Sequence, residues 1–175
     1  GAAADENILN STRATDFIAP PSPGEKRLRD AALALAATAP FARRLVNSGR
    51  LSVPTTYDTP LSTTDDSAWA GTAKLGAPVP DVPLMRPDGT ATHLTAVVSG
   101  RFMLLCVGEG ASDMPGVDML VIGRDAFDRE GLFAARFDAT PGACYLLRPD
   151  GHLAARWRSF DRSRIEDAIR RAKGF

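Results

Sequence analysis

The distribution of apolar residues changes near residue 75 of this 175-residue chain. Before that point, apolar residues recur at intervals of three or four, which is typical of helices with one apolar side. After it, short apolar runs are separated by Gly, Pro and Asp, which is typical of strands joined by turns. The pattern therefore predicts a helical segment followed by an α/β domain.

Residues 1–50 are predicted to form two or three helices. The first spans Asp5–Ile18 and ends before Pro20, because proline cannot continue a helix. A second begins at Ser22, a favourable N-cap followed by Pro and, three residues on, by Glu. Pro40 opens a third, which we expect to end near 47–49. These helices carry too few large apolar side chains for a core, so we expect them to pack on another surface.

Residues 51–75 are rich in Thr, Ser, Asp and Pro and are predicted to form an extended connector. Tyr57 and Trp69 are the side chains we expect to pin it. A connector of this length is unusual inside a compact domain. The sequence therefore predicts a boundary here, with a helical segment at 1–50 and an α/β domain at 76–175.

The tetrapeptide Arg-Pro-Asp-Gly occurs twice, at Arg86–Gly89 and at Arg148–Gly151. Pro presets φ for the first central position of a turn, and Gly accepts a positive φ. Both copies therefore predict β-hairpin turns. The paired runs are Val82–Arg86 with Ala91–His93, and Ala143–Leu147 with His152–Trp157.

The remaining elements alternate between strands and helices, which together with a final hairpin and helix predicts an α/β sandwich with a mixed sheet and flanking helices. They are a short helix or turn at Leu94–Val98, a central strand at Phe102–Val107, a buried strand at Asp118–Ile122, a helix at Asp125–Glu130, a strand at Phe133–Phe137 and a closing helix at Asp161–Lys173.

Composition and charge exclude several classes of partner. The formal net charge is zero and 44% of residues are apolar, so we expect no nucleic acid and no membrane surface as a partner. The N-terminus lacks the basic and apolar regions of a signal peptide, which predicts a cytoplasmic protein. Of the 21 basic residues 18 are Arg, as in GC-rich bacteria. Because the chain does not begin with Met, we expect it to start at a trimmed boundary.

The order of elements in 76–175 resembles a thioredoxin-like domain of the peroxiredoxin type. In thiol oxidoreductases of this fold, the nucleophilic Cys follows the central strand at a helix N-terminus. Here that strand is followed by Gly108–Pro115, which contains no Cys. Ala143 occupies the place expected for a cis-proline, and Pro141 lies two residues earlier. We therefore expect no thiol catalysis.

The two cysteines, Cys106 and Cys144, each lie inside a predicted buried strand. A disulfide framework would require more cysteines, placed in loops. We expect both to be free, reduced core thiols.

Other candidate sites are incomplete. Gly108–Asp113 partly matches the Gly-x-Gly-x-x-Gly fingerprint of dinucleotide-binding loops. Asp113 occupies the position of the third glycine, and Pro115 interrupts the helix that should follow. We therefore expect a plain glycine loop, and no catalytic, cofactor-binding or metal-ligating residue in this chain. His93 and His152, beside the turns, are expected to be exposed surface histidines, and Asp65 and Asp66 in the connector an N-cap or a solvated turn rather than a metal site. Four arginines could bind anions but are expected on solvated faces; they are Arg43, Arg44, Arg156 and Arg158.

Several segments resemble flavin-dependent aromatic hydroxylases of the p-hydroxybenzoate hydroxylase type, in particular the 3-(3-hydroxyphenyl)propionate hydroxylase branch. Asp5–Phe17 and Phe41–Ser52 are similar to late helices of those enzymes. The connector from Tyr57 to Trp69, the segment Gly76–Leu84 and the segment Leu147–Arg158 are similar to their C-terminal part, a thioredoxin-like domain without redox cysteines. The matching segments occur in the same order over almost the whole chain.

The resemblance implies a parent enzyme that uses FAD, NAD(P)H and oxygen to hydroxylate a phenolic substrate such as a hydroxyphenylpropionate. The FAD fingerprint would lie upstream of Gly1, so this part would bind no cofactor and would not be catalytic. Its partners would be the FAD and substrate domains of the same chain, and its thioredoxin-like unit would serve as scaffold and as a homo-oligomer interface.

Two alternatives remain open at the level of sequence. A stand-alone thioredoxin- or peroxiredoxin-like oxidoreductase would require Cys106 or Cys144 to be a reactive thiol. A non-catalytic interaction module would use helices Asp5–Ser48 as a docking arm.

Overall fold

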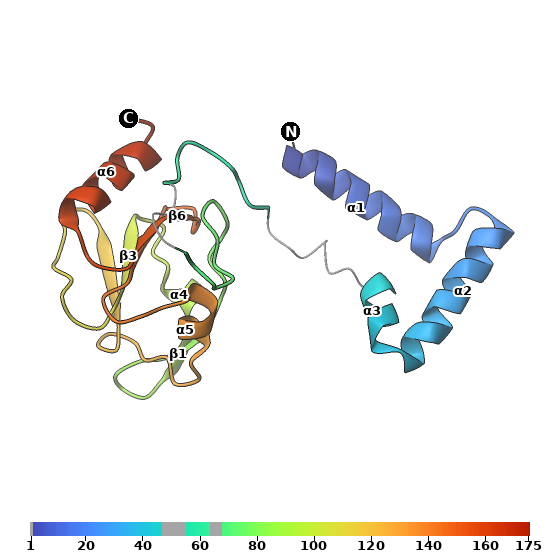
Figure 1. Cartoon of the computed structure of the whole chain (residues 1–175), viewed down its shortest axis with the longest axis horizontal. Helices are drawn as coiled ribbons and strands as arrows, with labels where there is room; N and C mark the ends of the chain where they lie inside the picture. Colours follow the sequence, from blue (N-terminus) through green and yellow to red (C-terminus); the bar gives the residue numbers. More distant parts are fainter. Residues whose placement is uncertain (1, 47–54, 64–67) are drawn as a thin grey trace. The chain divides into compact units, whose positions relative to one another are not determined.

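The computed structural model of the chain describes residues 2–46, 55–63 and 68–175. The chain divides into two compact units, Gly1–Thr55 and Thr56–Phe175. Figure 1 shows the helices of the first unit, labelled α1 to α3, and the strands and helices of the second.

The first unit contains helices α1 (Ala2–Ile18), α2 (Pro23–Thr38) and α3 (Pro40–Val46). The predicted start of α2 is confirmed, because the Ser22 hydroxyl accepts a hydrogen bond from the Glu25 amide at 3.2 Å. The same hydroxyl donates to the Glu25 carboxylate at 2.8 Å, which completes a capping box. The predicted end of the third helix, near residues 47–49, lies outside the described residues.

Two arginines connect the three helices through hydrogen bonds to carbonyl groups. Arg29 of α2 donates to the carbonyl of Ile18 at 2.9 Å, and Arg43 of α3 donates to the carbonyl of Ala36 at 3.0 Å. Helix α2 has no buried residue. The large apolar side chains of this unit that the structure shows exposed are Ile8, Leu9, Ile18, Leu28, Leu33, Leu35 and Phe41.

The second unit is built on a four-stranded mixed sheet with the order β4-β3-β5-β6. Strand β3 (Met103–Val107) is parallel to β4 (Asp118–Ile122) and antiparallel to β5 (Cys144–Leu147). Strand β6 (Leu153–Trp157) pairs antiparallel with β5. This sheet, with its flanking helices, confirms the predicted α/β thioredoxin-like sandwich.

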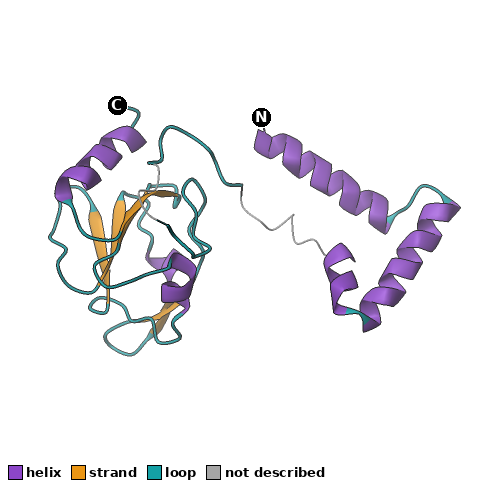
Figure 2. Cartoon of the chain, viewed as in Figure 1, coloured by secondary structure: helices purple, strands orange, loops and turns teal. Residues whose placement is uncertain are grey.

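Both faces of the sheet are buried. Figure 2 shows its strands together with the helices that flank them. On one face, Leu104 and Leu146 pack with Ile165 of helix α6 (Arg162–Ala172). On the other, Tyr145 packs against helix α5 (Leu132–Phe137). Burial on both faces explains why these strands are nearly continuous apolar runs rather than alternating ones.

Both predicted hairpin turns are confirmed. The first joins β1 (Pro83–Met85) to β2 (Ala91–His93), and the second joins β5 to β6. In each turn the amide of the final glycine bonds the carbonyl of the first arginine, at 3.0 Å in the first and 2.9 Å in the second. Gly89 and Gly151 have φ values of 84° and 77°, which L side chains rarely adopt.

The predicted strand at Phe133–Phe137 is wrong, because these residues form helix α5. The two phenylalanines are four residues apart, and their rings stack at 4.4 Å as neighbours on one helix face. The Asp128 carboxylate also accepts a hydrogen bond from the amide of Ala134, in the first turn of the helix. A short apolar run fits either a strand or a helix, so its periodicity could not decide the structure.

The predicted helix at Asp125–Glu130 is also wrong. Phe127 and Met85 exchange two backbone hydrogen bonds, at 2.8 and 2.9 Å, which form an antiparallel bridge to β1. These long-range bonds replace the local bonds that a helix would have used. The short helix or turn predicted after β2 is a helix, α4 (Leu94–Val97).

The described part of the connector is held on the second unit by backbone hydrogen bonds. The amide of Tyr57 donates to the carbonyl of Gly76 at 2.8 Å, and the amide of Thr63 donates to the carbonyl of Ala154 at 2.9 Å. Residues 51–54 and 64–67 lie outside the described residues. Tyr57 and Trp69 make the pinning contacts expected of them, as the next subsection describes.

Replacing Phe137, which is fully buried, by Ala should lower the free energy of unfolding of the second unit by about 3–5 kcal/mol. Urea unfolding followed by tryptophan fluorescence measures this unit, because Trp69 and Trp157 are the two tryptophans of the chain. The matched control is Phe175→Ala, since Phe175 is 91% exposed. Equal losses for the two variants would contradict the described core.

Candidate functional site

The first candidate site is the loop after β3, where a thioredoxin-like enzyme would carry its nucleophile. Residues 108–117, all described, connect β3 directly to β4 without a helix. A catalytic thiol of this fold needs the amides and dipole of a helix N-terminus to lower its pKa. The loop provides neither, so the structure lacks the local means of activating a thiol there.

The same loop does not fit a dinucleotide. Gly108 and Gly110 have positive φ values of 72° and 104°, as glycine loops often do. A pyrophosphate, however, is held at the N-terminus of the helix that follows such a loop, and no helix follows here. Instead Arg162 of α6 donates to the carbonyl of Asp113 at 2.6 Å. The geometry agrees with a plain glycine loop tied to α6.

The two cysteines lie side by side in the sheet. Cys106 on β3 is paired with Cys144 on β5, and their sulfur atoms are 3.5 Å apart. Both are buried, with 2% and 1% of their surface exposed. The hydrogen bond with Cys144 and burial together raise the pKa of the Cys106 thiol, so it is not activated as a nucleophile. Ala143, which replaces the expected proline, is fully buried.

His93 has a partner that the sequence did not reveal. Its Nδ1 lies 2.9 Å from the carboxylate of Asp81, twelve residues earlier. The Thr95 amide and hydroxyl donate to the other carboxylate oxygen at 3.0 and 2.9 Å. Burial opposes ionisation of Asp81, but these hydrogen bonds outweigh it and lower the carboxyl pKa. The threonine hydroxyl donates to Asp81 and not to His93. Thr95, His93 and Asp81 therefore do not form a catalytic triad in which the histidine would activate the hydroxyl as a nucleophile.

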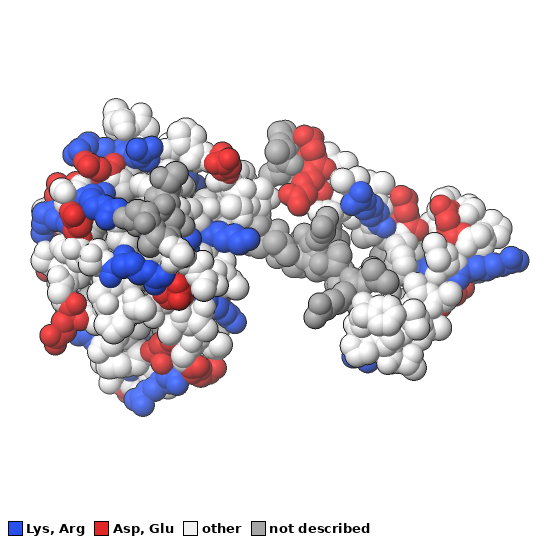
Figure 3. All heavy atoms as spheres, in the orientation of Figure 1, with Lys and Arg blue, Asp and Glu red and all other residues white. Residues whose placement is uncertain are grey.

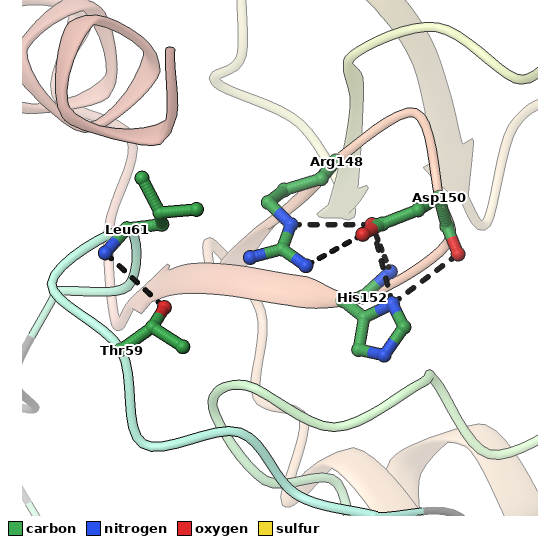
Figure 4. Close-up of polar contacts among 5 residues, drawn as sticks. All are labelled: Thr59, Leu61, Arg148, Asp150 and His152. Atoms are coloured by element: carbon green, nitrogen blue, oxygen red, sulfur yellow. Dashed lines mark hydrogen bonds and ion pairs between the residues drawn. The ribbon is translucent and has the colours of Figure 1, made fainter. Parts of the chain in front are cut away.

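His152 belongs to a compact group at the second hairpin turn, shown in Figure 4. The guanidinium of Arg148 holds both carboxylate oxygens of Asp150, at 3.2 and 2.5 Å, and the His152 amide donates to the same carboxylate at 3.1 Å. The bond from Arg148 lowers the pKa of Asp150 to about 2. The His152 side chain is only 16% exposed and its ring lies 5.7 Å from that of Tyr57, so the expected surface histidine is half-buried instead.

Two arginines predicted on a solvated surface instead clamp the connector. The guanidinium groups of Arg158 and Arg156 lie 3.6 and 4.8 Å from the centre of the Trp69 ring. Arg158 also donates to the carbonyls of Ala68 and Asp138, each at 2.7 Å. Arg156 donates to the carbonyl of Ala73 at 2.7 Å. We call Trp69, Arg156 and Arg158 the connector clamp; it is a structural device and not an anion site.

The other weak candidates gain no function from the structure. Arg43 bonds a carbonyl of α2, whereas the Arg44 side chain and the pair Asp65 and Asp66 lie outside the described residues. Across the described chain, no three His, Cys, Asp or Glu side chains gather closely enough to hold a metal ion. Within the same residues, no helix is both long and apolar enough to cross a membrane.

The surface of the second unit also lacks a built site among the described residues. Acidic and basic side chains are interspersed on the face shown in Figure 3. An open hollow of about 720 Å³ lies between residues 60–63 and α6. Of the arginines that line it, Arg170 pairs with Asp167. Nothing in this hollow combines a nucleophile, a base and an oxyanion donor.

The chain is similar to several known proteins. No protein-family model matches it. A curated relative, 12-dehydrotetracycline 5-monooxygenase/anhydrotetracycline 6-monooxygenase of Streptomyces rimosus, is 29% identical over 155 residues. The match covers 83% of this chain and 27% of the relative, so the chain spans about a quarter of the relative's length.

Two solved structures of similar fold contain FAD. The flavin-dependent monooxygenase PieE, solved with FAD and substrate, has a TM-score of 0.57 and 23% identity, over 93% of this chain and 31% of that one. Aklavinone-11 hydroxylase, solved with FAD and aklavinone, has a TM-score of 0.55 and 21% identity, over 84% and 34% of the two chains. The predicted resemblance to flavin-dependent hydroxylases is thus confirmed.

The connector clamp predicts that Arg158→Lys lowers the free energy of unfolding of the second unit by about 1–2 kcal/mol. Lysine lacks the planar fork that both covers the Trp69 ring and bonds two carbonyls. Urea unfolding measures the loss, and native tryptophan emission should shift to longer wavelength as Trp69 becomes hydrated. Arg101→Lys is the matched control, since Arg101 forms an exposed ion pair with Asp118. A red shift in the control alone would contradict the clamp.

The Arg148–Asp150 pair predicts a small pH dependence of stability. Because the folded pKa of Asp150, about 2, is below the ordinary 3.8, the pair stabilises the fold above pH 3.8 and loses its effect as pH falls toward 2. The half-exposed carboxylate limits the effect to less than about 1 kcal/mol. Urea midpoints should fall less steeply over this range in Asp150→Asn than in the unchanged chain. A titration of the Asp150 carboxyl by NMR with a midpoint near 4 would contradict the assignment.

Proposed function

We propose that this chain is the C-terminal part of an FAD- and NAD(P)H-dependent monooxygenase that hydroxylates an aromatic ring. In this proposal residues 1–50 are the end of the FAD and substrate domains, 51–75 is a connector, and 76–175 is a non-catalytic thioredoxin-like scaffold. Catalysis takes place on the part of the protein that precedes Gly1.

The exposed apolar side chains of α1, α2 and α3 are the observation that carries the proposal. Ile18, Leu28 and Phe41 are 72, 71 and 65% exposed, and α2 buries no residue at all. Exposing so much apolar surface is costly in water, and such patches normally contact another protein surface. The missing domains of the same polypeptide provide that surface, because the matched relatives are three to four times longer than the aligned part.

FAD, when bound to the parent enzyme, would supply the activation of oxygen for ring hydroxylation. The glycine loop after β3 does not fit its pyrophosphate, because this loop leads into no helix. The contribution of this chain is therefore structural and not catalytic. The first unit completes the surface of the upstream domains, and the connector clamp fixes the thioredoxin-like unit at the end of the connector.

The proposed substrate is a phenolic compound. The resemblance seen in the sequence favours a single ring such as a hydroxyphenylpropionate. The names of the curated relative and of aklavinone-11 hydroxylase instead point to fused-ring polyketides, so we extend the proposed class to polycyclic phenols. We further propose that the enzyme works in the cytoplasm and that the second unit contributes to a homo-oligomer interface.

A thiol oxidoreductase is the competing function. It requires an accessible thiolate, whereas Cys106 and Cys144 are buried and the pKa of Cys106 is raised by its bond with Cys144 and by burial. An independent interaction module would also expose apolar helices, but it would not explain why two flavin enzymes share the fold across both units. The monooxygenase proposal accounts for both observations.

The test is to produce the chain joined to the several hundred residues encoded upstream of Gly1. The longer protein should be yellow, with flavin absorbance and about one FAD per chain, and should consume NAD(P)H faster when a phenolic substrate is added. The isolated chain should be colourless. A longer protein that binds no flavin under any condition, although folded, would overturn the proposal.

The helix surface can be tested in the same longer protein. Leu28→Glu should weaken FAD retention or raise sensitivity to proteolysis near residue 28, because a charge would enter the proposed interdomain contact. In the isolated chain the same change should leave the urea unfolding of the second unit unaltered. Lys26→Glu, two residues earlier and exposed, is the matched control. Equal behaviour of both variants would argue against a buried helix surface.

A further inference from the structure

The pairing of β3 with β5 places Cys106 and Cys144 directly opposite each other. The flanking amide of Val107 bonds the carbonyl of Ala143 at 3.0 Å, so the two cysteines form a non-hydrogen-bonded pair. In such pairs the Cα atoms are about 4.5 Å apart, inside the range of about 4.4–6.8 Å that a disulfide spans. The sulfur atoms are already 3.5 Å apart, so side-chain rotation can close the remaining gap without backbone movement.

The pair also lies beside a loop rather than deep within the sheet. Cys106 is the last but one residue of β3, and Cys144 is the first of β5. Both therefore border loop 108–117, whose Met114 packs in the same apolar cluster. A small uncharged oxidant is the kind of reagent that can reach such a buried pair. Burial opposes ionisation of both thiols, so the reaction should be slow at neutral pH and faster in alkali.

We propose that Cys106 and Cys144 are an oxidation site at which peroxides form an intramolecular disulfide across β3 and β5. One thiolate attacks a peroxide oxygen, which breaks the O–O bond and gives a sulfenic acid and water. The second thiol then displaces the hydroxyl of the sulfenic acid, forming the S–S bond and releasing a second water. Two thiols and one hydrogen peroxide thus become one disulfide and two water molecules. This inference does not depend on the proposed function.

The disulfide would join two strands that the fold already holds together. Closing the segment from Cys106 to Cys144 restricts the unfolded chain more than the folded one, so oxidation should stabilise the second unit. The pair is not a turnover catalyst of the thioredoxin kind, because burial keeps protein substrates away from both sulfur atoms. It is a site of reversible cross-linking by small oxidants.

The experiment treats the whole folded chain with hydrogen peroxide at neutral and alkaline pH, then denatures it in acid and alkylates the free thiols. Intact-mass spectrometry should show a monomer that has lost two hydrogen atoms and takes up no alkylating agent. Dithiothreitol should restore both thiols. The oxidised chain should unfold at a higher urea concentration than the reduced chain.

Cys106→Ala and Cys144→Ala are the controls, with Cys106→Ser and Cys144→Ser as second variants if an alanine variant is not folded by circular dichroism. Each should gain oxygen atoms on the remaining sulfur and lose no hydrogen pair. Oxygen adducts on both cysteines of the unchanged chain, a disulfide that joins two chains, or cross-linking seen only in urea would each overturn the proposal. A lower urea midpoint for the oxidised chain would overturn its stabilising role.

Discussion

Coverage of both faces of the mixed sheet is the constraint on which the rest of the second unit depends. The central strands β3 and β5 are buried throughout, apart from Val107 at the end of β3, so each face must be closed by other elements. Helix α6 closes one face, while α5, α4 and the connector close the other. Since the connector belongs to this cover through Trp69, the second unit includes residues well before its first strand.

The same constraint explains how the fold can lose its usual catalytic machinery without collapsing. Loop 108–117 replaces the helix expected after β3, and its Met114 still fills part of the apolar cluster beneath α6. Packing therefore survives while the helix N-terminus that would activate a thiol disappears. A scaffold of this kind can be kept for its surfaces alone, which agrees with a supporting role beside catalytic domains.

The sequence predicted the elements whose signals are local. Both Arg-Pro-Asp-Gly turns, the strands they join and the Ser22 cap depend on residues within a few positions, and all are confirmed. Helix α5 was missed because its six residues are too few for periodicity to separate helix from strand. The Asp81–His93 contact and the clamp of Trp69 by Arg158 were missed because the partners are 12 and 89 residues apart. The sequence around Asp81 or Arg158 contains no local pattern that indicates such distant partners.

Arginine holds this unit together in an unusual way, through main-chain carbonyls rather than through carboxylates alone. Arg136 donates to the carbonyl of Asp81, Arg156 to that of Ala73 and Arg158 to those of Ala68 and Asp138. Carbonyl groups carry no net charge, so dissolved ions screen these bonds far less than they screen exposed ion pairs. Guanidinium groups also stay protonated at any pH a cell reaches. These carbonyl bonds should consequently persist through changes in ionic strength and acidity. The part of the attachment that uses the Asp138 carboxylate, which accepts from the Ala70 amide at 3.1 Å and from Arg158 at 2.6 Å, should instead weaken in acid.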